Sequence, residues 1–144
     1  MLYIIYAIIL ASLIIATVTD IRKREIPLWL FPIVIAVSTI INTVYIVHDG
    51  TYLDIIMLVA GFLIFGIAAY ILARKEKLGG GDVLMIATLG GSLGFIRAAE
   101  TILISCVIGV IFILITKKRS IPYAPLLLIG FIIDMILGFT IGYL

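Results

Sequence analysis

Residues Lys75–Gly91 read KEKLGGGDVLMIATLGG, so a basic stretch, three glycines and an aspartate, Asp82, stand directly before an apolar run. A buried carboxylate is costly unless it is paired, and consecutive glycines cost conformational entropy. A segment that only has to cross a lipid bilayer needs neither feature. The stretch therefore marks both the border of a membrane segment and a candidate functional site.

The rest of the chain has the composition of a membrane protein. Of its 144 residues, 65% are hydrophobic and 12% are charged, and the mean hydropathy is +1.39. A helix needs about 20 apolar residues to cross the roughly 30 Å hydrocarbon core. We therefore expect an all-α polytopic bundle of six transmembrane helices that forms a single domain over residues 1–144. The expected segments are Met1–Thr19, Leu28–Val47, Leu53–Ala73, Val83–Ile96, Ala99–Thr116 and Ala124–Leu144.

The basic residues predict how the bundle is oriented. Nine of the ten Lys and Arg residues lie in three clusters, Arg22–Arg24, Arg74–Lys77 and Lys117–Arg119. Six crossings place all three clusters on one side and leave only Arg97 on the other. Because basic loops stay in the cytoplasm, we expect both termini outside, three cytoplasmic loops and a multi-pass protein of the cell (inner or plasma) membrane. The net charge of +2 then reflects orientation and contact with bilayer lipids, not binding of nucleic acid.

Three aspartates are candidates for function. Asp20 and Asp82 are far apart in sequence but share the cytoplasmic border, whereas Asp134 lies ten residues into the last segment, about 15 Å deep. An intramembrane carboxyl is a functional candidate, although a hydrogen-bonded packing role for Asp134 is an equal alternative. We expect Gly79, Gly80 and Gly81 to form a loop that can adopt positive φ and lets a substrate backbone approach Asp82.

Elimination narrows the possible chemistry to carboxylates. The only histidine, His48, lies in an outer loop, and the only cysteine, Cys106, lies mid-helix, so we expect no metal site and no cofactor. Two aspartates can hydrolyse a peptide bond when one takes a proton from water and the other donates to the carbonyl. A helix C-terminus disfavours ionisation and a helix N-terminus favours it. Asp82 is therefore the expected base, and Asp20 is expected to hold the proton.

Three ordered motifs resemble those of the type IV prepilin peptidases, the GxGD membrane aspartic proteases. They are TDIRKREIP at Thr19–Pro27, GGGDVLMIATLGGSLG at Gly79–Gly94 and KRSIPYAPLLLIG at Lys118–Gly130, and the match covers essentially the whole chain. The resemblance implies that Asp20 and Asp82 are the catalytic pair. It also implies that leader peptides of prepilin-like proteins are cleaved at the cytoplasmic face.

Some features depart from the family pattern. Leu28 replaces an asparagine and Leu84 replaces a lysine, which puts substrate contacts in doubt but not the aspartate pair. The chain lacks the cytoplasmic region with paired cysteines that the family associates with N-methylation. The resemblance is therefore to a short, peptidase-only form.

Two other classes of function remain as alternatives. A small transporter or ion-conducting bundle would use Asp82 and Asp134, but it would need polar residues spread across the bilayer, and the second and third segments carry almost none. A non-catalytic membrane subunit would use its glycines for helix packing. Gly61, Gly66 and Gly109 are the expected packing glycines. The expected interfacial aromatics are Tyr3, Tyr6, Trp29 and Tyr143, the last of which lies outside the residues that the structure describes. The sequence leaves the particular substrate and the oligomeric state open.

Overall fold

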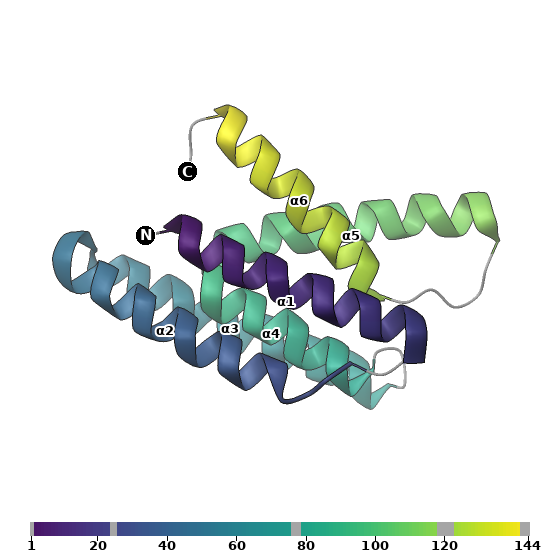
Figure 1. Cartoon of the computed structure of the whole chain (residues 1–144), viewed down its shortest axis with the longest axis horizontal. Helices are drawn as coiled ribbons and strands as arrows, with labels where there is room; N and C mark the ends of the chain where they lie inside the picture. Colours follow the sequence, from purple (N-terminus) through teal and green to yellow (C-terminus); the bar gives the residue numbers. More distant parts are fainter. Residues whose placement is uncertain (1, 24–25, 76–78, 118–122, 142–144) are drawn as a thin grey trace.

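A computed structural model describes residues 2–23, 26–75, 79–117 and 123–141. Within these ranges the chain forms six helices and no strand, as predicted (Figure 1). Four of the helices are long and apolar enough to span a membrane, namely α1, α2, α3 and α5, and α4 and α6 are shorter apolar helices. The bounds are α1 (Leu2–Lys23), α2 (Leu30–Asp49), α3 (Tyr52–Arg74), α4 (Gly80–Leu93), α5 (Phe95–Thr116) and α6 (Tyr123–Ile141).

The boundary between α4 and α5 differs from the predicted one. The sequence predicted a segment running on to Ile96, but α4 ends at Leu93 and α5 begins at Phe95. Gly94, with φ of 81°, separates them. A residue with a Cβ rarely adopts this left-handed conformation, so glycine allows two helices to meet with a single residue between them. The predicted segment was apolar across this break, which hid it.

Helices α3 and α4 pack with their backbones in direct contact. A Cβ added at Gly61 of α3 would lie 2.9 Å from the Phe95 nitrogen and still closer to the Gly90 carbonyl oxygen. A Cβ at Gly90 would meet the Gly61 backbone in the same way. Glycine is therefore required at both positions for this approach. The predicted packing role is confirmed for Gly61, and Gly109 likewise lies against α6, since a Cβ added there would lie 3.2 Å from Leu126 Cδ1.

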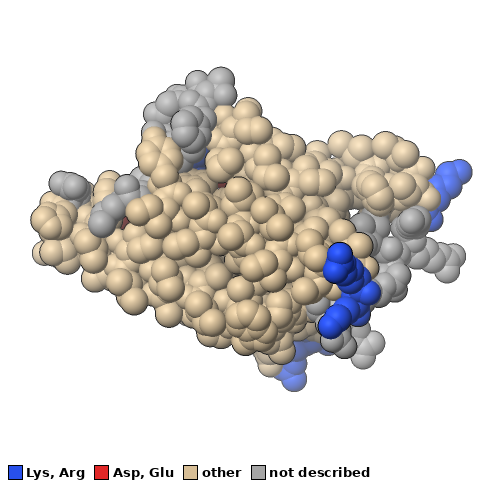
Figure 2. Space-filling model, in the orientation of Figure 1, with Lys and Arg blue, Asp and Glu red and all other residues tan. Residues whose placement is uncertain are grey.

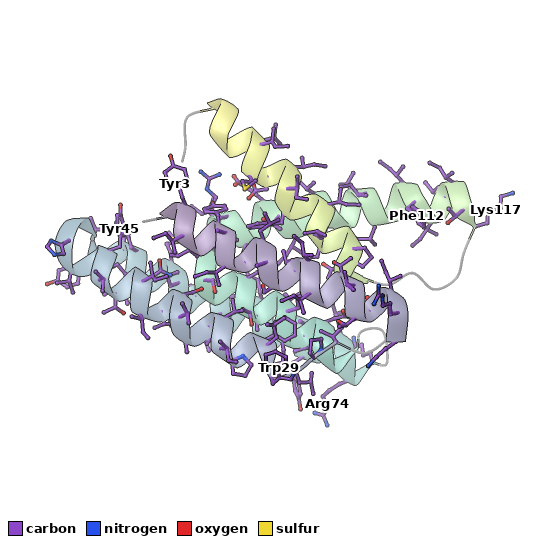
Figure 3. All side chains as sticks on the ribbon, viewed as in Figure 1. Tyr3, Trp29, Tyr45, Arg74, Phe112 and Lys117 are labelled. Carbon is purple, nitrogen blue, oxygen red and sulfur yellow. The ribbon has the colours of Figure 1, made fainter. Side chains whose placement is uncertain are left out.

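The core lies where α1 meets α2, α4 and α6. Its members are apolar side chains, among them Ile9, Leu13, Phe31, Met85, Leu89 and Phe131. Tyr6 belongs to this core, because it is only 4% exposed and stacks on Phe131 with ring centroids 5.6 Å apart. The prediction that Tyr6 is an interfacial anchor was therefore wrong. Tyr3 and Trp29 are exposed and lie toward opposite ends of the bundle, as interfacial aromatics would (Figure 3).

Charge and apolar surface are separated on the outside of the bundle. Helices α1, α3 and α5 end at the same end of the bundle, and their basic residues gather there, with a broad uncharged surface between the two ends (Figures 1 and 2). The described members of this group are Arg22, Lys23, Arg74, Lys75 and Lys117. Such a surface fits a bilayer with one polar border at the basic end. That this end faces the cytoplasm stays a prediction.

Candidate active site

Asp20 lies near the end of α1, on the face that packs against the core. Ala16, Thr17 and Asp20 are buried at helical spacing, whereas Val18 and Ile21, on the other face of the helix, are exposed. The Asp20 side chain is only 9% exposed, and its Oδ2 atom has no hydrogen-bond partner among the described residues. A buried carboxylate oxygen without a partner is costly, so it is a candidate for a role in chemistry.

Asp82 lies in the first turn of α4, at the third helical position. Its Oδ2 accepts the Gly79 backbone N–H at 3.3 Å, which caps the start of the helix. Its other oxygen, Oδ1, is buried and has no partner within the part of the chain that the structure describes. Asp82 thus has one oxygen that is hydrogen-bonded to the start of the helix and one that has no described hydrogen-bond partner.

The fold brings Asp20 and Asp82 together. Helix α1 ends and α4 begins at the same end of the bundle (Figure 1), and the Asp20 charge acts on Asp82 through space. Asp82 precedes the apolar run of α4, which starts at Val83, and it lies outside the four long candidate spans. Burial raises the pKa of the Asp82 carboxyl, the Gly79 N–H lowers it, and the Asp20 charge raises it again, with a net rise. This direction is opposite to the one that the helix N-terminus alone would give, because burial exceeds the effect of the Gly79 N–H; which aspartate holds the proton stays a prediction.

The three glycines before Asp82 do not form the expected loop. Gly79 is the N-cap of α4 in an extended conformation, with φ of −72°, and Gly80 and Gly81 belong to the first helical turn. The expected positive φ is also absent here, since Gly94 is the only described glycine that has it. A Cβ at Gly81 would lie 2.8 Å from Ile26 Cβ, so this glycine makes room for the connection between α1 and α2.

Gly80 differs from its neighbours. A Cβ added there would meet no atom of the described residues within 4 Å, and the residue is exposed. Packing within the described chain therefore does not explain why this position is glycine. Of the three glycines, Gly80 is the one beside which the described chain leaves open space.

Two residues near the aspartates were not singled out from the sequence. Thr17 lies one turn before Asp20 on the same buried face, and its hydroxyl oxygen is buried with no described partner. Tyr123, the first residue of α6, places its hydroxyl within electrostatic range of Asp82. The available signals were the spacing of three residues between Thr17 and Asp20, and the place of Tyr123 in the motif after the third basic cluster.

Asp134 lies apart from this site. It is 3% exposed, and its Oδ2 accepts a hydrogen bond from the Thr101 hydroxyl at 3.1 Å. Thr101 lies near the start of α5, and Arg97 and Glu100 of the same helix form an ion pair at 3.5 Å. Helix α6 begins alongside the middle of α5, because Gly109 contacts Leu126 and Gly130 contacts Ser105. Asp134 is therefore near the end opposite Asp82, and the packing alternative fits its surroundings.

The described residues offer no group of three or more His, Cys, Asp or Glu side chains arranged to hold a metal ion. What the site at the start of α4 presents instead is two carboxyl groups near enough for the Asp20 charge to act on Asp82. Each carboxylate has a buried oxygen without a described partner, and a threonine hydroxyl lies one turn away from Asp20. Such a pair can take a proton from water and give one to an acceptor.

Comparison with known proteins identifies the family. The model of the type IV leader peptidase family matches residues 7–114. A type 4 prepilin-like proteins leader peptide-processing enzyme of Escherichia coli O78:H11 is 38% identical over 81 residues, which cover 50% of this chain and 30% of that protein. A prepilin leader peptidase/N-methyltransferase of Bacillus subtilis is 29% identical over 144 residues, covering 93% and 56% respectively.

The chain thus spans less than two thirds of the length of either relative. No solved structure matches it. The family match, however, covers most of the chain and includes Asp20, Gly79–Gly81 and Asp82. The chain therefore belongs to the type IV leader peptidase family.

Proposed function

We propose that this chain is a membrane aspartic endopeptidase that removes the leader peptide of type IV prepilin-like proteins at the cytoplasmic face of the cell membrane. One observation carries the proposal: Asp20 of α1 and Asp82 of α4 lie at the same end of the bundle, near enough for the Asp20 charge to act on Asp82, and each has a buried oxygen with no partner among the described residues. Family membership supports prepilin-like proteins as the substrates.

In the proposed reaction, the ionised aspartate takes a proton from a water molecule as the water oxygen bonds to the scissile carbonyl carbon. The other aspartate, which is protonated, gives its proton to the carbonyl oxygen. The tetrahedral intermediate collapses when its C–N bond breaks: the aspartate that acted as base gives the proton it took from water to the leaving nitrogen. The other aspartate takes a proton back from one hydroxyl of the intermediate as the new carbonyl forms, which restores the pair. Asp82 has the raised pKa, so we assign it the proton and assign Asp20 the role of base.

The open side of Gly80 is the proposed approach of the substrate. An extended substrate segment needs its backbone close to the aspartates, and a side chain at Gly80 would occupy that space. Gly79 lies beside it, exposed and extended. The bilayer would hold the apolar part of the substrate next to the bundle, which fits the broad uncharged surface in Figure 2.

A cleavage assay tests the proposal. Purified protein in detergent is mixed with candidate prepilins from the same genome, alongside Asp20→Asn, Asp82→Asn and, as a matched control, Asp134→Asn. Loss of either proton-transfer group should slow cleavage by at least about 100-fold. Asp134→Asn should still cleave, because Asp134 is bonded to Thr101 away from the pair. Normal cleavage by both Asp20→Asn and Asp82→Asn would contradict the proposal, as would wild-type protein that cleaves none of several prepilins.

A further inference from the structure

The hydroxyl of Thr17 is not satisfied by its own helix. In a helix, a serine or threonine hydroxyl commonly donates to the carbonyl oxygen three or four residues earlier. Ser12 donates to the Ile9 oxygen at 2.7 Å in this way, and Thr19 donates to the Ile15 and Ala16 oxygens, each at 2.9 Å. Thr17, between them on α1, makes no such bond within the described chain, although it is only 8% exposed.

The unpaired hydroxyl of Thr17 lies close to the two candidate catalytic aspartates. Residues three apart on a helix are neighbours on its surface, so Thr17 lies beside Asp20, whose Oδ2 is also buried and unpaired. Asp82 Oδ1, on the helix that meets α1 here, is in the same state. Ser38 and Ser92 also have unpaired buried hydroxyls, but Ser92 lies at the far end of α4 from Asp82.

Three buried polar atoms without partners would each be costly if they had no shared ligand. A buried water molecule typically makes about three hydrogen bonds to polar groups of this kind. The three atoms are one hydroxyl and two carboxyl oxygens, and the pair of aspartates is where water is consumed in the proposed reaction. A water molecule held by all three would be satisfied, and so would they.

We propose that Thr17 is a positioning residue of the aspartate pair, and that its hydroxyl holds the attacking water against Asp20 Oδ2. The inference rests on the proposed function, since the water is the one that the pair activates. Thr17 donates no proton to the substrate and forms no covalent bond. Its role is to fix the direction from which the water oxygen reaches the carbonyl carbon.

The test compares Thr17→Val, Thr17→Ser and, as a matched control, Thr19→Val in the cleavage assay. Valine keeps the shape and β-branching of threonine but removes the hydroxyl, whereas serine keeps the hydroxyl. We expect Thr17→Val to lower kcat by about 10- to 100-fold with KM within about twofold of wild type, because only the positioning of water is lost. Thr17→Ser should recover most of kcat, and Thr19→Val should match wild type.

Thermal unfolding separates positioning from a structural role. The Thr17 hydroxyl donates to no described protein group, so Thr17→Val loses only its hydrogen bond to the water and should unfold within about 4 °C of wild type. A structural role predicts a larger fall in the unfolding temperature, with a proportionate loss of kcat that Thr19→Val shares. Wild-type kcat in Thr17→Val would overturn the inference, as would a loss that serine does not reverse.

The outcomes for the two proposals are distinct. If Asp20→Asn is inactive and Thr17→Val is fully active, the inference fails and the proposed function stands. If wild type cleaves no prepilin, the proposed function fails, and infrared spectra then test separately whether the Thr17 hydroxyl and Asp20 share a water molecule. The carboxyl band that disappears in Asp20→Asn should shift in Thr17→Val and stay in place in Thr19→Val. An unshifted band would overturn the inference that Thr17 and Asp20 hold the same water molecule.

Discussion

The backbone contact between α3 and α4 predicts that Gly61→Ala destabilises the protein. The new methyl group would lie 2.9 Å from the Phe95 nitrogen, where ordinary contact begins at 3.4 Å, and it would lie closer still to the Gly90 carbonyl oxygen. The obstructing atoms belong to the backbone, so no side-chain rotation relieves the overlap. The helices must therefore separate by half an ångström or more.

The magnitude follows from two opposing effects. Overpacking of a well-packed interior costs about 1–3 kcal/mol, and a clash with backbone belongs at the upper end of this range. Replacing glycine by alanine within a helix returns about 0.5–1 kcal/mol of conformational entropy. The net loss is then about 2 kcal/mol, or a fall in Tm of roughly 4–10 °C for a chain of this size. Cleavage should fall too, because α4 carries Asp82.

Gly66→Ala is the matched control, five residues further along the same helix. A Cβ at Gly66 would meet only the Ala87 methyl group, at 3.3 Å. This variant should therefore unfold within about 2 °C of wild type, and the two variants differ only in what the new methyl group contacts. Thermal unfolding of both in the same detergent, followed by circular dichroism, makes the measurement. The reasoning is refuted if Gly61→Ala unfolds at or above the temperature of Gly66→Ala.

Two further predictions concern the start of α4. Burial gives Asp82 a folded-state pKa above its unfolded value of 3.8. The contribution of the protonated Asp82 carboxyl to the free energy of unfolding is therefore fully present below pH 3.8, and it is lost as the pH rises through the folded-state pKa. Asp82→Asn, although inactive, should thus unfold at a higher temperature than wild type at pH 7, and the advantage should shrink below about pH 4; an advantage that is constant with pH would contradict this. Gly80→Ala should keep or slightly raise stability, since its Cβ meets nothing, yet slow cleavage, whereas Gly81→Ala should lose stability because its Cβ meets Ile26. Undiminished cleavage by Gly80→Ala would contradict the proposal that the substrate backbone approaches the aspartates beside Gly80.

The sequence predicted the class of the fold, and the placing of Asp20 and Asp82 at one end of the bundle, better than it predicted the ends of the helices. Composition and apolar segments are enough for six helices, because burial of backbone polar groups in a bilayer leaves few other structures. The boundary at Gly94 and the helical start at Gly80 depend on backbone conformation, which hydropathy does not report. The same reason explains why the glycines before Asp82 were expected to form a loop.

The remaining errors came from packing between helices. Asp134 was placed at mid-membrane by counting residues from the start of its segment, but α6 begins beside the middle of α5, so the count does not measure depth. Tyr6 stacks on Phe131 of α6, a partner far away in sequence. The unpaired hydroxyl of Thr17 is likewise visible only when its surroundings are known.

The shortness of α4 matters because longer helices surround it. Its 14 residues rise about 21 Å, roughly 9 Å less than the hydrocarbon core of a typical bilayer. Half of these residues are buried inside the bundle, so α4 depends on its longer neighbours and not on lipid to cover its middle. Protein therefore shields the carboxyl group at the start of α4 from the acyl chains. Hydrolysis consumes one water per bond, and that water would reach Asp82 between helices instead of through lipid.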